Sequence, residues 1–213
     1  MATILRDLSY RYQWLYDGIA GASALAVGGE SRFRQLALQG LEITPQTAIL
    51  DLCCGAGQTT RYLVEKSDRV TGLDASPFAI QRAQKNVPQA DYVEAFAENM
   101  PLADATFDLV HTSVALHEMK PEQLQAILKE VYRVLKPGGT FAFIDFHKPH
   151  NPVFWPGLAM FLWLFETETS WQLLNTNLVE LLTDIGFQTP QQRLFVGGSL
   201  QAIQAKKVGS CFS

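Results

Sequence analysis

Short apolar segments alternate with helix-like segments through the middle of the chain, and this alternation limits the possible folds more than any other feature. The expected strands are 48–53, 70–74, 91–96, 107–116 and 140–146. Strands that alternate with helices pair in parallel, and the helices then cover both faces of the sheet. The sequence therefore predicts a doubly wound, Rossmann-like α/β fold with a mostly parallel sheet.

The C-terminal part is expected to complete this sheet. Two strand-like runs, about 191–196 and 200–206, flank Gly197-Gly198-Ser199. Such a pattern predicts an antiparallel hairpin, here at the edge of the sheet. The sheet would then have seven strands.

Three helices have recognisable end signals. Ser76-Pro77 predicts the start of a helix that runs to about Asn86. A second helix, with apolar residues at helical spacing, is expected to stop at Lys136-Pro137-Gly138-Gly139. Asn177 predicts the start of a third helix, which ends at Gly186.

The composition excludes several classes of protein. Of 213 residues, 47% are apolar and 18% are charged, so a sizeable core is expected and extensive disorder is not. The net charge is −4 and no long basic run is present, so nucleic acid is not an expected partner. Three cysteines without framework spacing are typical of a reducing compartment, and we expect no metal site because ligand spacing is lacking.

We expect a cytoplasmic protein. The N-terminus lacks the apolar core of a signal peptide. The longest apolar run, Pro152 to Phe165, has fourteen residues. A helix that spans a membrane needs about 20.

The loop after the first strand is the first candidate binding site. Gly55 and Gly57 allow a sharp turn and a close approach of the backbone to a ligand. A helix is expected to begin near Gln58, so its free N–H groups could bind a carboxylate, while Asp51 could receive an ammonium group. A dinucleotide fingerprint would need a third glycine where the chain has Thr60. The pattern therefore favours an amino-acid ligand over a dinucleotide.

Asp74 ends the second strand, seventeen residues after Gly57. An acid near this spacing can accept two hydrogen bonds from ribose hydroxyls. The alternative is that Asp74 only caps the helix that starts at Pro77. Together with the glycine loop, Asp74 predicts an adenosine-type ligand.

Four segments carry a resemblance to a known family: ILDLCCGAGQTTRYL, VTGLDASPFAIQRAQKN, EAFAENMPLADATFDLVHTSVALHEM and VYRVLKPGGTFAFIDF. In this order and spacing, over roughly residues 45–146, they resemble the motifs of class I S-adenosylmethionine-dependent methyltransferases. The segment YRYQWLYDGIAG (10–21) is similar to the ubiquinone/menaquinone C-methyltransferase-like group. The resemblance implies S-adenosyl-L-methionine as cofactor and methyl transfer as activity.

The resemblance also implies which residues bind the cofactor, in chain order from the methionine end to the ribose, then the adenine, and last a residue beside the cofactor after the fourth strand. These are Asp51, Cys53, Gly55, Ala56 and Gly57, then Asp74, then Ala75, Phe96 and Ala97, and finally Ser113. We interpret Cys53 and Cys54 as small packing residues rather than nucleophiles, because methyl transfer needs no thiolate.

Phe96 departs from the family pattern. The family often has an Asp at this position, and that Asp accepts a hydrogen bond from the adenine amino group. Phe96 can stack or pack on adenine but cannot accept this bond, so backbone groups would have to replace it.

Two apolar regions could form the side of the site that receives the methyl acceptor. Tyr10, Tyr12, Trp14 and Tyr16 could fold over the site as a lid and place a ring near the sulfonium, or could pack against the sheet. The stretch 154–166 could cap an apolar acceptor, contact a membrane surface, contact a second subunit in a homodimer, or be ordinary core. These regions predict a small aromatic, quinone-like or lipid-like acceptor.

His117 is the candidate catalytic base, because it follows the fourth strand at the mouth of the expected crevice and a neutral imidazole can accept a phenolic proton. A structural role is the alternative. His147 and His150 follow the fifth strand on the same rim and are further candidates.

We expect a single methyltransferase domain over 1–213. Its parts are a helical N-terminal lid (1–44), the cofactor-binding core (45–146), an apolar acceptor-side insertion (147–175), and a C-terminal helix and hairpin (176–213). One alternative is a regulatory protein that binds the cofactor without turnover. Another is a nicotinamide-dependent reductase, against which the glycine loop argues.

Overall fold

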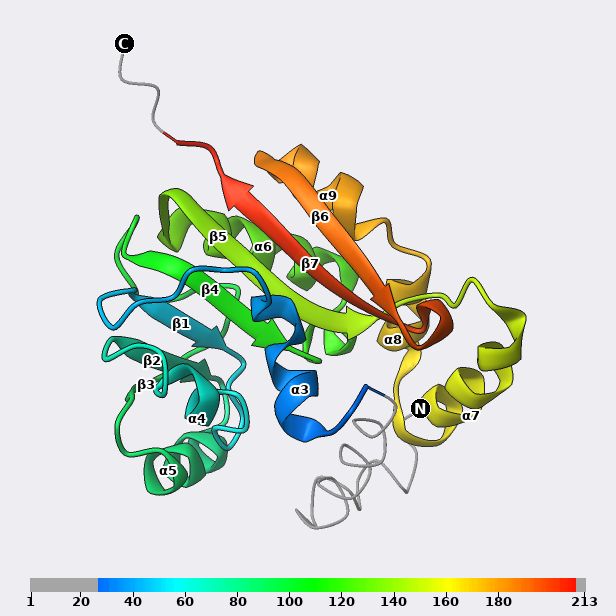
Figure 1. Ribbon diagram of the computed structural model, residues 1–213, viewed down its shortest axis with the longest axis horizontal. Helices are drawn as coiled ribbons and strands as arrows, with labels where there is room; N and C mark the ends of the chain where they lie inside the picture. Colours follow the sequence, from blue (N-terminus) through cyan, green and yellow to red (C-terminus); the bar gives the residue numbers. More distant parts are fainter. Residues whose placement is uncertain (1–26, 210–213) are drawn as a thin grey trace.

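The structure is a computed structural model that describes residues 27–209 (Figure 1). The aromatic residues Tyr10 to Tyr16 and the third cysteine, Cys211, lie outside the described residues. The expected lid is therefore represented only by its last part, from Val27 onward.

One seven-stranded sheet forms the centre of the molecule, in the order β3-β2-β1-β4-β5-β7-β6. Neighbours from β3 to β5 pair in parallel, whereas β7 pairs antiparallel with both β5 and β6. The predicted fold class, with its C-terminal antiparallel hairpin, is confirmed. The strands are β1 (Ile49–Leu52), β2 (Val70–Asp74), β3 (Asp91–Glu94), β4 (Phe107–Ser113), β5 (Leu135–Phe146), β6 (Phe187–Phe195) and β7 (Leu200–Lys207).

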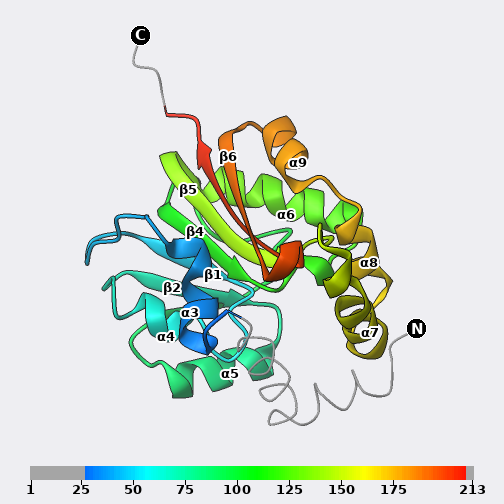
Figure 2. The same ribbon diagram turned by 45° about the vertical axis from the view of Figure 1, so that its right-hand side comes forward.

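Helices cover both faces of this sheet (Figures 1 and 2). One face packs against α3, the short turn η1 and α4, and the other packs against α6 and α9. The helices are α3 (Glu30–Gln35), α4 (Thr60–Leu63), α5 (Pro77–Asn86), α6 (Pro121–Val134), α7 (Trp155–Phe165), α8 (Glu168–Leu174) and α9 (Leu178–Ile185). The described residues also form the 3₁₀ turns η1 (Leu36–Leu38), η2 (Leu116–Glu118), η3 (Pro152–Phe154) and η4 (Val196–Gly198).

The helix-end signals have the expected geometry. The Ser76 hydroxyl accepts a hydrogen bond from the Ala79 N–H at 3.3 Å, which caps α5. The Asn177 side chain accepts one from the Glu180 N–H at 3.2 Å, which caps α9. Gly186 ends α9 in the left-handed conformation, with φ 113°.

The structure differs from the predicted boundaries after α6. No separate loop follows the helix, because the backbone of Leu135 already pairs with Phe107 and β5 starts there. The pairing shifts between Phe107 and Leu109, so that Thr140 is the next residue of β5 in register. Lys136 stabilises this irregular start by donating to both carboxylate oxygens of Asp108, at 2.8 and 2.9 Å.

The insertion after β5 folds as η3, α7 and α8, beyond the carboxyl end of β5 (Figure 1). Leu158 and Leu162 of α7 form a small apolar cluster with Leu174 of α8. Other apolar side chains of the same stretch face solvent, among them Met160 and Trp163, which are 62% and 70% exposed. Among residues 27–209, none of the helices is long and apolar enough to cross a membrane.

Candidate active site

A cavity of about 540 Å³ opens at the carboxyl ends of β1, β2 and β4. β1 lies between β2 and β4 in the sheet. The chain adds strands on one side of β1 up to β3 and on the other side from β4 onward, so the direction of strand addition reverses at β1. Ligands of doubly wound sheets bind at such a reversal. Cys53 follows β1 and Val114 follows β4, and both line the cavity. Both adopt the left-handed backbone conformation, with φ 55° and 56°. Strain of this kind clusters at functional sites.

Nine of the ten predicted cofactor-binding residues line this cavity; Gly57 does not. A Cβ on Gly57 would lie 3.1 Å from the Val87 side chain, so this glycine permits close packing of the loop against α5. The loop amides also have partners within the chain. Gly55 N–H donates to Asp74 and Ala56 N–H donates to Gln58, at 2.9 and 3.0 Å.

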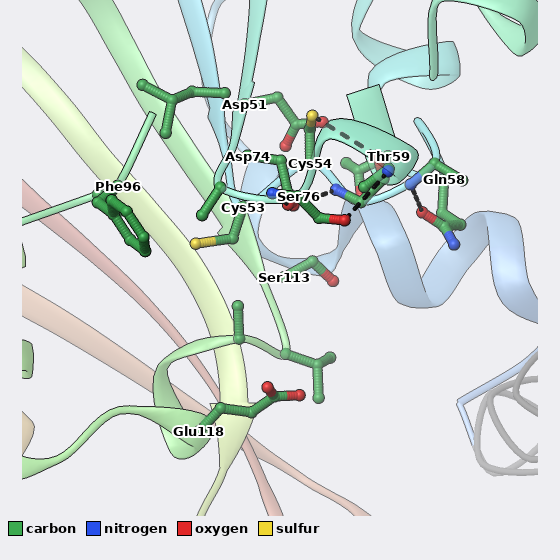
Figure 3. A pocket seen from close by; sticks show the side chains of 18 of the residues that line it. Asp51, Cys53, Cys54, Gln58, Thr59, Asp74, Ser76, Phe96, Ser113 and Glu118 are labelled. Atoms are coloured by element: carbon green, nitrogen blue, oxygen red, sulfur yellow. Dashed lines mark hydrogen bonds between the residues drawn. The ribbon is translucent and has the colours of Figure 1, made fainter. Parts of the chain in front are cut away.

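Asp51 and Asp74 lie in the wall of the same cavity, but their surroundings differ (Figure 3). Asp51 is almost fully buried, where it accepts a hydrogen bond from the Thr60 hydroxyl at 2.7 Å and lies 3.2 Å from His111 Nδ1. Asp74 is half-buried and accepts hydrogen bonds from the backbone N–H groups of Gly55 and Ser76, each at 2.9 Å. Asp74 therefore presents its carboxylate at the cavity surface, whereas Asp51 helps to fix the loop from beneath.

Cys53 and Cys54 both line the cavity with neutral thiols. Burial, the largest cause, raises the pKa of each, and the charges of Asp74 and Asp51 raise it further. A thiolate is therefore disfavoured at neutral pH, which agrees with a packing role.

Arg34 of α3 is a cavity residue that sequence reasoning missed. Its Nη1 donates to the Ser113 hydroxyl at 3.3 Å, and its buried Nε has no hydrogen-bond partner among the described residues. The side chain is only 7% exposed. The sequence holds no signal for this contact, because Arg34 lies in a six-residue helix 79 positions before Ser113.

His117 does not lie in the cavity wall. Its ring is buried between two carboxylates, with Nδ1 2.8 Å from Asp145 Oδ1 and Nε2 3.4 Å from Glu166 Oε2. Burial alone would lower the pKa of His117, but the charge and hydrogen bond of Asp145, followed by those of Glu166, outweigh it and raise the pKa to about 10. The geometry therefore gives no support to His117 as the base, since it lies away from the cavity and holds its protons.

The other predicted rim residues occupy different positions. His147 Nδ1 lies 2.8 Å from the carbonyl oxygen of Gly198, and neither His147 nor His150 lines the cavity. Phe96 lies at the cavity rim and is 67% exposed (Figure 3). Glu98, two residues further on, also lines the cavity and accepts a hydrogen bond from Gln123 at 3.4 Å.

The cavity residues fit an adenosine with an amino-acid tail. Asp74 offers a partly exposed carboxylate that can accept hydrogen bonds from a ribose diol. At the other side, Arg34 is a buried cation. Its Nε makes no hydrogen bond within the described residues and lies 3.9 Å from Glu30 Oε1, and a buried guanidinium of this kind suits a ligand carboxylate. Within the described part of the chain, no group of His, Cys, Asp and Glu side chains forms a metal site.

Comparisons with known proteins agree with this assignment. Residues 49–139 match the model of a methyltransferase domain. The chain is 57% identical over 206 residues to an uncharacterized methyltransferase of Synechocystis sp., covering 97% of each chain. It is 34% identical to a 2-phytyl-1,4-naphtoquinone methyltransferase of Thermosynechococcus vestitus, covering 70% of this chain and 67% of the relative.

A solved S-adenosylmethionine-dependent methyltransferase from Mesorhizobium loti has the same fold, with a TM-score of 0.63 at 20% identity, covering 85% of this chain and all of the other. Family, fold and cavity are consistent with one another. This chain belongs to the class I S-adenosylmethionine-dependent methyltransferases.

Proposed function

We propose that this enzyme methylates the reduced, aromatic form of a quinone that carries an apolar tail. The observation that carries the proposal is the position of the apolar insertion at the same end of the sheet as the cofactor cavity. The distant relatives that methylate quinones support this acceptor class.

The insertion is linked to the cavity wall through a row of rings. His117 directly precedes the cavity residue Glu118. The centroid of the His117 ring lies 4.6 Å from that of Phe146. Phe146 packs in turn at 5.6 Å on Phe161 of α7. Among the described residues, α7 contributes no side chain to the cavity wall. We propose that α7 and its neighbours hold the apolar tail, while the ring enters the cavity.

In this proposal, separate residues bind the ribose, the methionine tail and the adenine of the cofactor. Asp74 accepts hydrogen bonds from the ribose hydroxyls, and Arg34 binds the carboxylate of the methionine tail. Ala75 and Ala97 flank the adenine, and Glu98 accepts a hydrogen bond from its amino group in place of the acid that Phe96 lacks. S-adenosylmethionine supplies an electrophilic methyl group, so the protein mainly has to align the acceptor at about 3–3.5 Å and exclude water.

We also propose that the insertion rests on a membrane surface. Residues 151–165 contain no charged side chain, and Val153, Met160 and Trp163 are each more than half exposed. Apolar and tryptophan side chains of this kind favour the boundary between headgroups and acyl chains. A quinone with a long tail would be taken from that boundary.

The experiment is a transfer assay with purified enzyme. S-adenosylmethionine with a labelled methyl group is incubated with 2-phytyl-1,4-naphtoquinone, kept reduced by dithionite, in detergent micelles. We expect a labelled lipid product, and the unreduced quinone serves as the control because its ring is a poor nucleophile. Binding of S-adenosylhomocysteine without any labelled product from the reduced quinone would remove this acceptor class.

A further inference from the structure

We propose that Glu118 is the catalytic base that takes the proton from the hydroxyl group of the methyl acceptor. This inference rests on the proposed function, because only an acceptor with an ionisable hydroxyl needs a base. Glu118 follows the same strand as His117, but it lines the cavity where His117 does not. Figure 3 shows Glu118 well apart from Asp74, on the side of the cavity that the segment after β4 forms.

The other acidic groups of the cavity occupy different parts of its wall. Asp51 is buried beneath the loop and bonded to Thr60. Asp74 accepts two backbone hydrogen bonds on the ribose side. Glu98 is bonded to Gln123 on the adenine side. Glu118 is therefore the carboxylate, among the described cavity residues, that stands on the wall left for the acceptor.

The charge of Glu118 acts on another residue of the cavity wall, Cys53. Its charge contributes to the raised pKa of Cys53, behind burial and Asp74. The Glu118 carboxylate therefore lies close enough to the loop after β1 to act on a side chain there. An acceptor ring between these two walls would meet Glu118 on one side and the cofactor on the other.

The buried cluster around His117 fixes the direction of Glu118. Asp145 accepts hydrogen bonds from the backbone N–H groups of Leu116 and His117, at 2.8 and 3.2 Å, and from the His117 ring at 2.8 Å. Ser170 of α8 donates to the His117 carbonyl oxygen at 3.3 Å. These bonds anchor η2 to β5 and to α8, so that the next residue is held toward the cavity. His117 is thus a positioning residue for Glu118.

The proposed step conserves atoms and charge. The acceptor O–H bond breaks and its proton passes to Glu118, which leaves a phenolate. The ring carbon next to the phenolate carbon bonds to the methyl group while the methyl–sulfur bond breaks, and the electron pair of that bond stays on sulfur. The ring carbon then loses its hydrogen as a proton to water, and the oxygen regains a proton from Glu118. One proton is released for each methyl group transferred.

The first test needs no turnover. The probes are 2-naphthol, which has a hydroxyl donor, and 2-methoxynaphthalene, which lacks it, and both are titrated into enzyme loaded with S-adenosylhomocysteine. Because a hydrogen bond to a charged group contributes about 1.5–3 kcal/mol, we expect a preference for the naphthol of roughly tenfold or more. Glu118→Leu should abolish this preference. Glu122→Leu, which removes an exposed carboxylate of α6 outside the cavity, should keep it.

The second test uses the reduced quinone. Glu118→Gln should lower kcat by about a hundredfold or more while the affinity for S-adenosylhomocysteine stays unchanged. A wild-type enzyme without a preference for naphthol, or a preference that survives Glu118→Leu, would overturn the role of Glu118. If the preference depends on Glu118 but the reduced quinone is not methylated, then the base stands and the quinone acceptor is wrong.

Discussion

Replacing His117 by Gln should change how the stability of the protein depends on pH. In the folded state both ring nitrogens face carboxylates, those of Asp145 and Glu166, and the side chain is only 3% exposed. A neutral imidazole has one N–H group and would leave one of these carboxylates facing a lone pair. The folded protein therefore holds the imidazolium, and its pKa rises from 6.5 to about 10.

The sign and size of the effect follow from linkage. Because the folded pKa lies above the unfolded one, the stabilisation is fully present below about pH 6.5 and is lost as the pH rises through about 10. Within this window each pH unit removes about 1.4 kcal/mol. Between pH 7 and pH 9 the wild type should lose roughly 2–3 kcal/mol more than His117→Gln, whose amide does not titrate.

Urea unfolding at pH 7, 8 and 9 measures this difference. His150→Gln is the matched control, because His150 is exposed and lies outside the buried cluster. Its stability should follow the wild-type curve at each pH. If the gap between wild type and His117→Gln stays constant from pH 7 to pH 9, the buried imidazolium is ruled out.

Four further outcomes are expected. Asp74→Asn should weaken S-adenosylhomocysteine binding by about tenfold or more in calorimetry, because a charged acceptor for the ribose is lost; an unchanged Kd would exclude that contact. Arg34→Gln should weaken S-adenosylhomocysteine about tenfold yet leave 5′-methylthioadenosine, which lacks the carboxylate, unaffected; equal losses for both ligands would refute a tail contact. Cys53→Gly should be more stable to urea than Cys53→Ala by about 1 kcal/mol, since φ is 55° there and Ala keeps the left-handed strain; equal stabilities would mean that the strain is absent. Trp163→Ser should reduce binding to phospholipid vesicles by about tenfold, whereas Val208→Ser should bind them as the wild type does. Equal binding by the wild type and both variants would argue against the membrane contact.

The fold could be predicted because its signals are local. Ser76 and Asn177 act on backbone groups three residues away, and their caps have the expected geometry. The start of β5 could not be placed from local signals. The residues that end α6 pair immediately with β4, and this pairing depends on Phe107, which is distant in sequence.

The cavity wall was predictable where it follows the strand ends and unpredictable where it depends on contacts across the chain. Gly55 and Asp74 lie at fixed offsets from β1 and β2, so their place in one cavity follows from the order of strands. His117 also follows a strand, but its direction is set by Asp145 and Glu166, which no spacing links to it. Arg34 reaches Ser113 only because α3 packs on the sheet.

The position of β7 between β5 and β6 affects the order in which the protein can assemble during synthesis. β6 leaves the ribosome first, yet its hydrogen-bonding partner is β7, which follows it in the sequence. Until β7 is made, β5 has an open edge and β6 has no neighbour within the sheet. The strands β1 to β4 face no such delay. They pair with one another as β1–β2, β1–β4 and β2–β3, and all four are synthesised before β6 and β7. The nascent chain can therefore form the cofactor pocket while its last third still presents an open strand edge to chaperones or to other chains.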